Sequence, residues 1–218
     1  EVMSQGITLT SSTENGRKHW QIQGRSSSSS DELQMANGLK IFPYWMYSTL
    51  PSRLALGDAF TQALRQKVQI TPEIQTLANQ ITQGQNSDFD KAQAIARWIA
   101  KEMRYVAIFV GTGGYVPHNL PDILKNRYGD CKDHTLLMMG LLKAAGIESA
   151  PTLINTANAD WTPPIAAAVY NHVLVYIPGL KLFHDPTASQ IPFGKLPWSD
   201  SAKPVVVGLP SGSQDMRT

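Results

Sequence analysis

The chain has 218 residues, of which 42% are hydrophobic, so it can form one sizeable core or one core with a small appended piece. Its net charge is +2 with 17% charged residues, and no run of Lys and Arg is interleaved with aromatic residues, so a nucleic-acid partner is not indicated. A single cysteine excludes an internal disulfide framework and a cysteine-rich zinc module. No apolar stretch reaches the roughly 18 to 20 residues that span a bilayer. The start at Glu1, without an initiator methionine or signal peptide, is expected of a trimmed or mature form.

Residues 1–50 are predicted to be a partial, β-rich N-terminal region. Residues 7–10 and 19–22 alternate with a period of two, and the turn signal Glu-Asn-Gly at 14–16 separates them. The five-serine run at 26–30 cannot pack a core, so we expect a loop there.

Residues 51–218 are predicted to form the main domain, which begins with three helices. The first covers about 58–67. The second has Thr71 as N-cap and Pro72 at its first helical position, and the third follows Asp88. In each segment the apolar residues recur at spacings of three and four, which is typical of a helix that faces a core.

The second half of the domain has a β pattern. The apolar run at 105–110 is followed by Gly-Thr-Gly-Gly at 111–114, which we interpret as a loop beside a cleft because it lacks the Lys-Ser/Thr of a phosphate-binding loop. Short strands are predicted at 152–155, 172–177, 182–184 and 205–207. Helices followed by strands predict an α+β fold with segregated layers.

Cys131 is predicted to lie in the first turn of an apolar helix that ends at Gly146. Asp130 is placed as N-cap, and Asp133 completes a pair like a capping box. The N–H groups and dipole of a helix N-terminus favour a thiolate and can bind an oxyanion. The alternative is an inert buried thiol, but the charged neighbours, Lys132 among them, argue against a dry environment.

A reactive thiol needs a base, and His172 is the best placed of the histidines. The chain offers five: His19, His118, His134, His172 and His184. His134 lies one turn after Cys131 and is interpreted as a partly exposed helix residue. A metal pair of these two lacks further ligands at useful spacing. His172 starts a predicted strand, in which it alternates faces with aliphatic residues.

A hairpin turning at Pro178-Gly179 would bring a carboxylate to His172. With a two-residue loop, Asp185 lies directly opposite His172, with Cβ atoms roughly 5 Å apart. A four-residue loop, which Pro-Gly also allows, shifts Asp185 opposite Leu174 on the same sheet face. In both registers Asp185 can accept from the imidazole, whereas His184 points to the other face. An isolated surface pair is the alternative.

Three motifs resemble those of the transglutaminase-like superfamily. They are Tyr-Gly-Asp-Cys-Lys-Asp at 128–133, Asn-His-Val at 171–173 and His-Asp-Pro-Thr at 184–187. The resemblance covers about 55–190. Within it, the chain is similar to bacterial proteins in which this core follows a β-rich domain. It implies a papain-like, α+β core whose cysteine starts a central helix packed on an antiparallel sheet.

The resemblance also implies a Cys-His-Asp triad with Cys131 as nucleophile, His172 as general base and acid, and Asp185 as orienting carboxylate. The implied reaction is acyl transfer on protein or peptide amides through a thioester, with water giving hydrolysis and an amine giving crosslinking. A cysteine protease or amidase is favoured, and a true transglutaminase or a silent binding module are the alternatives.

Several further expectations follow from the sequence or the resemblance. No cofactor or metal is expected, because no acidic loop resembles the calcium site of animal crosslinkers. Tyr115 or Asn119 could supply the second oxyanion donor, and the loops at 111–117 and 158–164 would set specificity. The resemblance favours a periplasmic or otherwise extracytoplasmic location, with a cytoplasmic one as the alternative. The oligomeric state has no signal in the sequence.

Overall fold

The computed structural model describes residues 2–24, 44–107, 114–157, 163, 165–166 and 169–218. The serine run at 26–30 and the glycines at 111 and 113 lie outside the described residues. So do residues 108–110 of the apolar run and most of the proposed specificity loop at 158–164. Among the described residues, no helix combines the length and the apolar character needed to cross a membrane.

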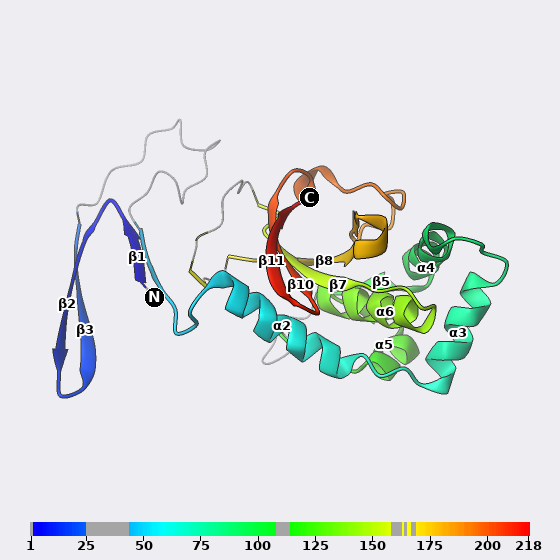
Figure 1. Cartoon of the computed structure of the whole chain (residues 1–218), viewed down its shortest axis with the longest axis horizontal. Helices are drawn as coiled ribbons and strands as arrows, with labels where there is room; N and C mark the ends of the chain where they lie inside the picture. Colours follow the sequence, from blue (N-terminus) through cyan, green and yellow to red (C-terminus); the bar gives the residue numbers. More distant parts are fainter. Residues whose placement is uncertain (1, 25–43, 108–113, 158–162, 164, 167–168) are drawn as a thin grey trace.

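Two antiparallel ribbons form the N-terminal part. Strand β1 (Val2–Gln5) pairs with β4 (Tyr44–Tyr47), and β2 (Thr8–Glu14) pairs with β3 (Arg17–Gln23). Asn15 and Gly16 turn the second ribbon with positive φ angles of 51° and 74°, so the predicted strands and turn are confirmed. This ribbon is exposed along almost its whole length and projects from the rest of the chain (Figure 1). The division of the chain at residue 50 stays a prediction.

The helices of the main part are α2 (Arg53–Lys67), α3 (Pro72–Thr82), α4 (Asp88–Glu102), α5 (Leu120–Asn126) and α6 (Cys131–Ala144). Helix α2 starts five residues before its predicted beginning. Ser52 caps it, since its Oγ accepts from the Ala55 N–H at 3.1 Å. The predicted cap of α3 is confirmed, because Thr71 Oγ1 accepts from the Ile74 N–H at 3.3 Å.

The main sheet is antiparallel, with the order β11-β10-β7-β8-β9. Its strands are β7 (Ala150–Ile154), β8 (His172–Ile177), β9 (Leu182–His184), β10 (Pro204–Leu209) and β11 (Gly212–Arg217). Strand β11 was not predicted, because Gly-Ser-Gln-Asp is polar and gives no β signal at this sheet edge. A short parallel ladder joins β5 (Arg104–Tyr105) to β6 (Tyr128–Gly129), directly before α6.

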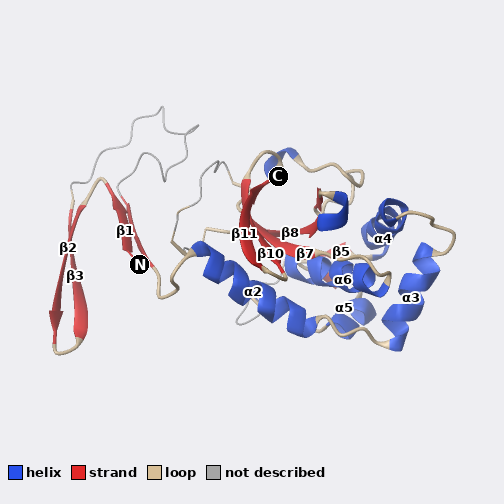
Figure 2. Cartoon of the chain, viewed as in Figure 1, coloured by secondary structure: helices blue, strands red, loops and turns tan. Residues whose placement is uncertain are grey.

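Helix α6 is the centre of the core. Every residue from the first to the twelfth of this helix is buried. Its aliphatic side chains form one cluster with Ile74, Ile95 and Ile99 from the neighbouring helices and with Val175 and Ile177 from β8. Each fully buried Leu or Ile contributes roughly 1.5 to 3 kcal/mol. The chain is therefore an α+β protein with a central helix packed on an antiparallel sheet, as expected (Figure 2).

Candidate active site

The capping box predicted at Cys131 is present. Asp130 accepts from the backbone N–H groups of Lys132 at 3.0 Å and of Asp133 at 3.4 Å. Asp133 in turn accepts from the Asp130 N–H at 3.3 Å. Cys131 is therefore the first helical residue, only 5% exposed, and its side chain packs against Leu153 of the sheet. The sulfur lies at the positive end of the helix dipole.

The glycine before this box is required by close packing. A Cβ on Gly129 would lie 2.4 Å from the Cβ of Asp133. The Asp133 carboxylate also accepts from the backbone N–H of His118 at 2.9 Å and lies 3.0 Å from its Nδ1. The Gly-Asp-Cys sequence thus allows Asp133 to fold back and hold the segment that precedes α5 against the helix N-terminus.

The charged residues around Cys131 are buried, which differs from the sequence interpretation. Asp130 is 2% exposed and Lys132 is 4% exposed, and Lys132 Nζ lies 2.5 Å from Asp130 Oδ2. The charges were interpreted as a sign of a wet surface, but here they neutralise one another inside the fold. A sequence with neighbouring opposite charges is therefore compatible with a buried ion pair as well as with an exposed surface.

His172 and Asp185 are brought together by the β8–β9 hairpin. Val175 is paired with His184 and Ile177 with Leu182, so the loop contains four residues and the second predicted register is the observed one. Asp185 follows β9 immediately, across from Leu174. Its Oδ2 lies 3.0 Å from His172 Nε2.

Thr187 fixes the orientation of Asp185. Its backbone N–H donates to Asp185 Oδ1 at 2.8 Å and its hydroxyl donates to the same oxygen at 2.7 Å. Thr187 belongs to the motif at 184–187, but no role was predicted for it. The Asp-x-Thr spacing, which is typical of a carboxylate that accepts from the backbone two residues on, could have indicated it.

The imidazole of His172 contacts both Asp185 and Cys131. Burial disfavours its charged form, but hydrogen bonds with Asp185 and with the thiol of Cys131 outweigh this and raise the pKa of His172 to about 10. Burial acts against the charge of Asp185 too, but the bonds from His172 and Thr187 lower the pKa of Asp185 to about 2. An imidazolium–carboxylate pair is the favoured state at neutral pH. Since Nε2 is bonded to Asp185, Nδ1 is the nitrogen left for the sulfur.

His134 is buried, so its interpretation as a partly exposed residue is wrong. It is 3% exposed, because α6 is covered on all sides, and its Nδ1 lies 2.9 Å from the backbone oxygen of Asp130. Burial lowers the pKa of His134, which favours a neutral ring that donates from Nδ1. This hydrogen bond therefore stabilises the N-terminal turn of α6.

His184 is a buried histidine whose titration should be visible in the stability of the protein. It is 5% exposed, its Nδ1 has no hydrogen-bond partner among the described residues, and burial lowers its pKa to about 4. An unfolded histidine titrates near pH 6.5, so between these values the unfolded chain binds more protons. The stabilising contribution of neutral His184 is complete above about pH 6.5 and is lost as the pH falls towards 4.

We therefore expect His184→Phe to reduce the loss of stability in acid. The free energy of unfolding in urea would be measured at about pH 7 and about pH 4.5 for both proteins, on either side of the ordinary histidine pKa. Wild type should lose more stability between the two values than the variant does. Equal losses would show that His184 does not titrate in this range.

The two suggested oxyanion donors are not tied to Cys131 by any bond in the described part of the chain. Asn119 Oδ1 accepts from Lys67 Nζ at 2.8 Å and its Nδ2 donates to Asp122, while Tyr115 is 76% exposed. Tyr105 lies near enough to Cys131 for the charge of the sulfur to act on it. Its pKa is raised by burial and then by the charges of Cys131, Asp130 and Asp185. The β5–β6 ladder places it there, a pairing too short to predict.

Asp200 joins His172 and Asp185 in a cluster that was not predicted from the sequence. It ends the 3-10 turn η4 (Trp198–Asp200) and is 1% exposed. One ligand atom from each of the three residues lies within 4.8 Å of the others. Such a set resembles a metal site, but His172 Nε2 and Asp185 Oδ2 already bond to one another at 3.0 Å. We therefore do not assign these residues as metal ligands.

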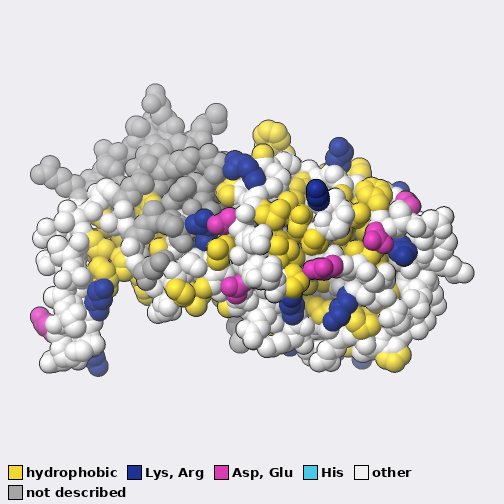
Figure 3. All heavy atoms as spheres, in the orientation of Figure 1, with side chains coloured by type: hydrophobic (Ala, Val, Ile, Leu, Met, Phe, Trp, Pro, Cys, Tyr) yellow, Lys and Arg dark blue, Asp and Glu magenta, His cyan; other side chains and the backbone are white. Residues whose placement is uncertain are grey.

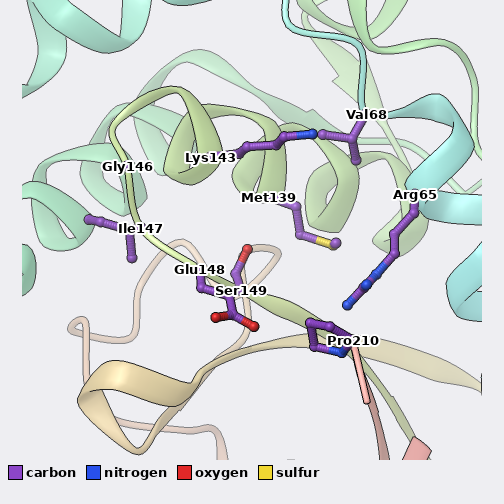
Figure 4. Close-up of a pocket in the computed structure, with 9 residues that line it drawn as sticks. All are labelled: Arg65, Val68, Met139, Lys143, Gly146, Ile147, Glu148, Ser149 and Pro210. Atoms are coloured by element: carbon purple, nitrogen blue, oxygen red, sulfur yellow. The ribbon is translucent and has the colours of Figure 1, made fainter. Parts of the chain in front are cut away.

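One cleft lies beside the site and another lies far from it. One of about 220 Å³ lies beside Asp185 and is lined by Gln93 and Arg97 of α4. Another of about 530 Å³ lies at the far end of α6, where Arg65, Met139 and Lys143 line it (Figure 4). With a rise of 1.5 Å per residue, Lys143 is roughly 18 Å along the helix from Cys131, so this second cleft does not serve the thiol.

On the face seen in Figure 3, basic side chains are scattered among acidic ones.

Residues 75–181 match the family model of the transglutaminase-like superfamily. This segment includes Cys131 and His172, and Asp185 lies just beyond it. The fold is similar to that of "a putative protease from Parabacteroides distasonis ATCC 8503", with a TM-score of 0.74 and 19% sequence identity over 99% of this chain and 41% of the other.

A second crystal structure, "a putative cysteine protease from Cytophaga hutchinsonii", has a TM-score of 0.42 and 15% identity, covering 86% of this chain and 64% of the other. No curated protein matches the chain. The chain thus spans less than two thirds of the length of both structures. At 19% identity, the first likeness establishes the fold.

Proposed function

This chain belongs to the transglutaminase-like superfamily, and on that premise we propose that it is a thiol-dependent hydrolase of protein or peptide amides. In this proposal Cys131 is the nucleophile, His172 the general base and acid, and Asp185 the carboxylate that orients His172. The observation that carries it is the meeting of these side chains from α6, β8 and the end of β9, with the imidazole bonded on both sides.

The acylation step uses the helix N-terminus. The thiolate of Cys131, whose proton rests on His172, attacks the carbonyl carbon of the amide and forms a C–S bond. The resulting oxyanion accepts a hydrogen bond from the Cys131 backbone N–H, which has no partner within the helix. The C–N bond then breaks, and His172 gives its proton to the leaving amine, which leaves a thioester on Cys131.

Deacylation repeats the step with a second nucleophile. His172, now neutral, takes a proton from water while the water oxygen attacks the thioester, and the carboxylic acid leaves as the C–S bond breaks. The proton returns to the Cys131–His172 pair. Asp185 stays ionised throughout and keeps the Nε2–H of His172 in place, which leaves Nδ1 to face the sulfur.

Transfer to an amine is the second proposal, and membership of the superfamily favours it. The two reactions share the thioester and differ only in whether water or an amine attacks it. A silent binding module is disfavoured, since a scaffold has no need of a buried imidazole that bonds a thiol and a carboxylate.

Product analysis separates these functions. Denatured casein would be incubated with the protein in the presence and absence of excess dansylcadaverine, with Cys131→Ala as the control. New chain termini or deamidated glutamine, seen by mass spectrometry and absent with the control, support the hydrolase. Dansyl incorporation with ammonia release supports the transferase. Products that form equally with Cys131→Ala would contradict both.

A further inference from the structure

We propose that Asp200 is a further positioning residue of this site, which in its protonated form donates a hydrogen bond to Asp185 and so holds that carboxylate against His172. This inference rests on the proposed function of the three residues. Asp200 would touch neither the substrate nor the sulfur and would act only through Asp185.

The first support is the set of partners around the Asp200 carboxyl group. Its Oδ1 accepts from Ser199 Oγ at 2.7 Å, and its backbone oxygen accepts from Thr218 Oγ1 at 2.6 Å. Its Oδ2 is fully buried and meets no donor among the described residues. A buried carboxylate oxygen without a donor is unfavourable, whereas a protonated one becomes a donor itself.

The second support is the acceptor that lies within reach. Asp200 approaches Asp185 closely enough for a hydrogen bond between the two side chains, and both are at most 5% exposed. Two carboxyl groups this close in a buried site do not both ionise, so one of them keeps a proton. Asp185 already accepts from His172 and Thr187, which makes it the ionised member.

The pKa shifts of the two carboxyl groups also favour a protonated Asp200 and an ionised Asp185. Burial raises the pKa of Asp200 and the charge of Asp185 raises it further, while Ser199 and the charge of His172 oppose the change. The pKa of Asp185 moves the other way, to about 2. The charge of Asp185 also acts on His134, His184 and Tyr105, which come from α6, β9 and β5.

Two substitutions separate the donor from the bulk of the side chain. Asp200→Asn keeps an N–H donor for Asp185 and an oxygen that accepts from Ser199, but it cannot ionise. Asp200→Leu keeps the branch at Cγ but has no donor. The readout is the rate at which iodoacetamide alkylates Cys131, followed by mass spectrometry, because this is the only cysteine of the chain. We expect the Asn variant to react like wild type and the Leu variant to be roughly 10- to 100-fold slower, as for one lost hydrogen bond to a charged group.

Infrared difference spectra test the proton itself. At about pH 5.5, where an ordinary aspartic acid is ionised, wild type minus Asp200→Asn should show the C=O stretch of a protonated carboxyl group. This measurement decides the question even if the Leu variant does not fold. Absence of the band, or an Asn variant that reacts as slowly as the Leu variant, overturns the inference.

His172→Ala separates failure of the inference from failure of the proposed function. A slow His172→Ala variant beside a Leu variant that matches wild type would overturn the role of Asp200 and leave the function standing. If His172→Ala reacts as fast as wild type, the proposed function fails and the positioning role with it. The infrared band would then report only a carboxyl pair without a catalytic task.

Discussion

Asp185→Asn is expected to slow the acylation of Cys131 by p-nitrophenyl acetate by up to about 10⁴-fold, as loss of the orienting carboxylate does in a triad. Thr187 is the reason that asparagine cannot substitute here. Its N–H and O–H both point at Oδ1 of Asp185, so the amide oxygen of asparagine would turn to them. The NH₂ group would then face His172 Nε2 and favour the tautomer with its proton on Nδ1, which cannot accept from the thiol.

The measurement is the initial burst of nitrophenolate at neutral pH. Asp215→Asn is a matched control, because it makes the same chemical change at an exposed residue that pairs with Arg53. The control should react like wild type. A burst in Asp185→Asn within about twofold of wild type would contradict the orienting role, since the expected loss is orders of magnitude larger.

Asp130→Ala is expected to lower the free energy of unfolding by about 3 to 5 kcal/mol, the cost of breaking a buried ion pair. The substitution removes the N-cap of α6, and it also takes from Lys132 the carboxylate that lies 2.5 Å from its ammonium group. Lys132 is 4% exposed, so water cannot readily replace that partner. Urea unfolding followed by circular dichroism measures the change.

Ser87→Ala provides the control for the capping effect alone. Ser87 caps α4 through its Oγ, which accepts from the Asp90 N–H at 3.1 Å in an exposed setting. We expect a loss of about 1 kcal/mol there. If Asp130→Ala costs no more than Ser87→Ala, the ion pair with Lys132 does not contribute as described.

The sequence predicted the parts of the site that local rules determine. A capping box is defined within four consecutive residues, so the position of Cys131 at the start of α6 followed from Asp130 and Asp133. A hairpin fixes its own register through its loop, so the proximity of His172 and Asp185 followed from counting across the turn.

Features that depend on tertiary packing were not predictable. The burial of His134 follows from elements on all sides of α6, and Tyr105 reaches the site through a two-residue ladder. Asp200 lies in an irregular segment between β9 and β10, where no periodic pattern points to Asp185. Strand β11 is a polar edge strand whose partner, rather than its composition, defines it.

The most direct test of the proposed Cys131–His172 pair is the pH dependence of Cys131 alkylation by iodoacetamide in wild type and in His172→Ala. Since the pKa of His172 is raised to about 10, its imidazolium is present throughout the neutral range and favours the thiolate beside it. We predict fast alkylation already at about pH 6, well below the ordinary thiol range, and a sharp loss of rate in the variant. An ordinary thiol profile centred at about pH 8.5, unchanged in His172→Ala, would contradict the Cys131–His172 pair.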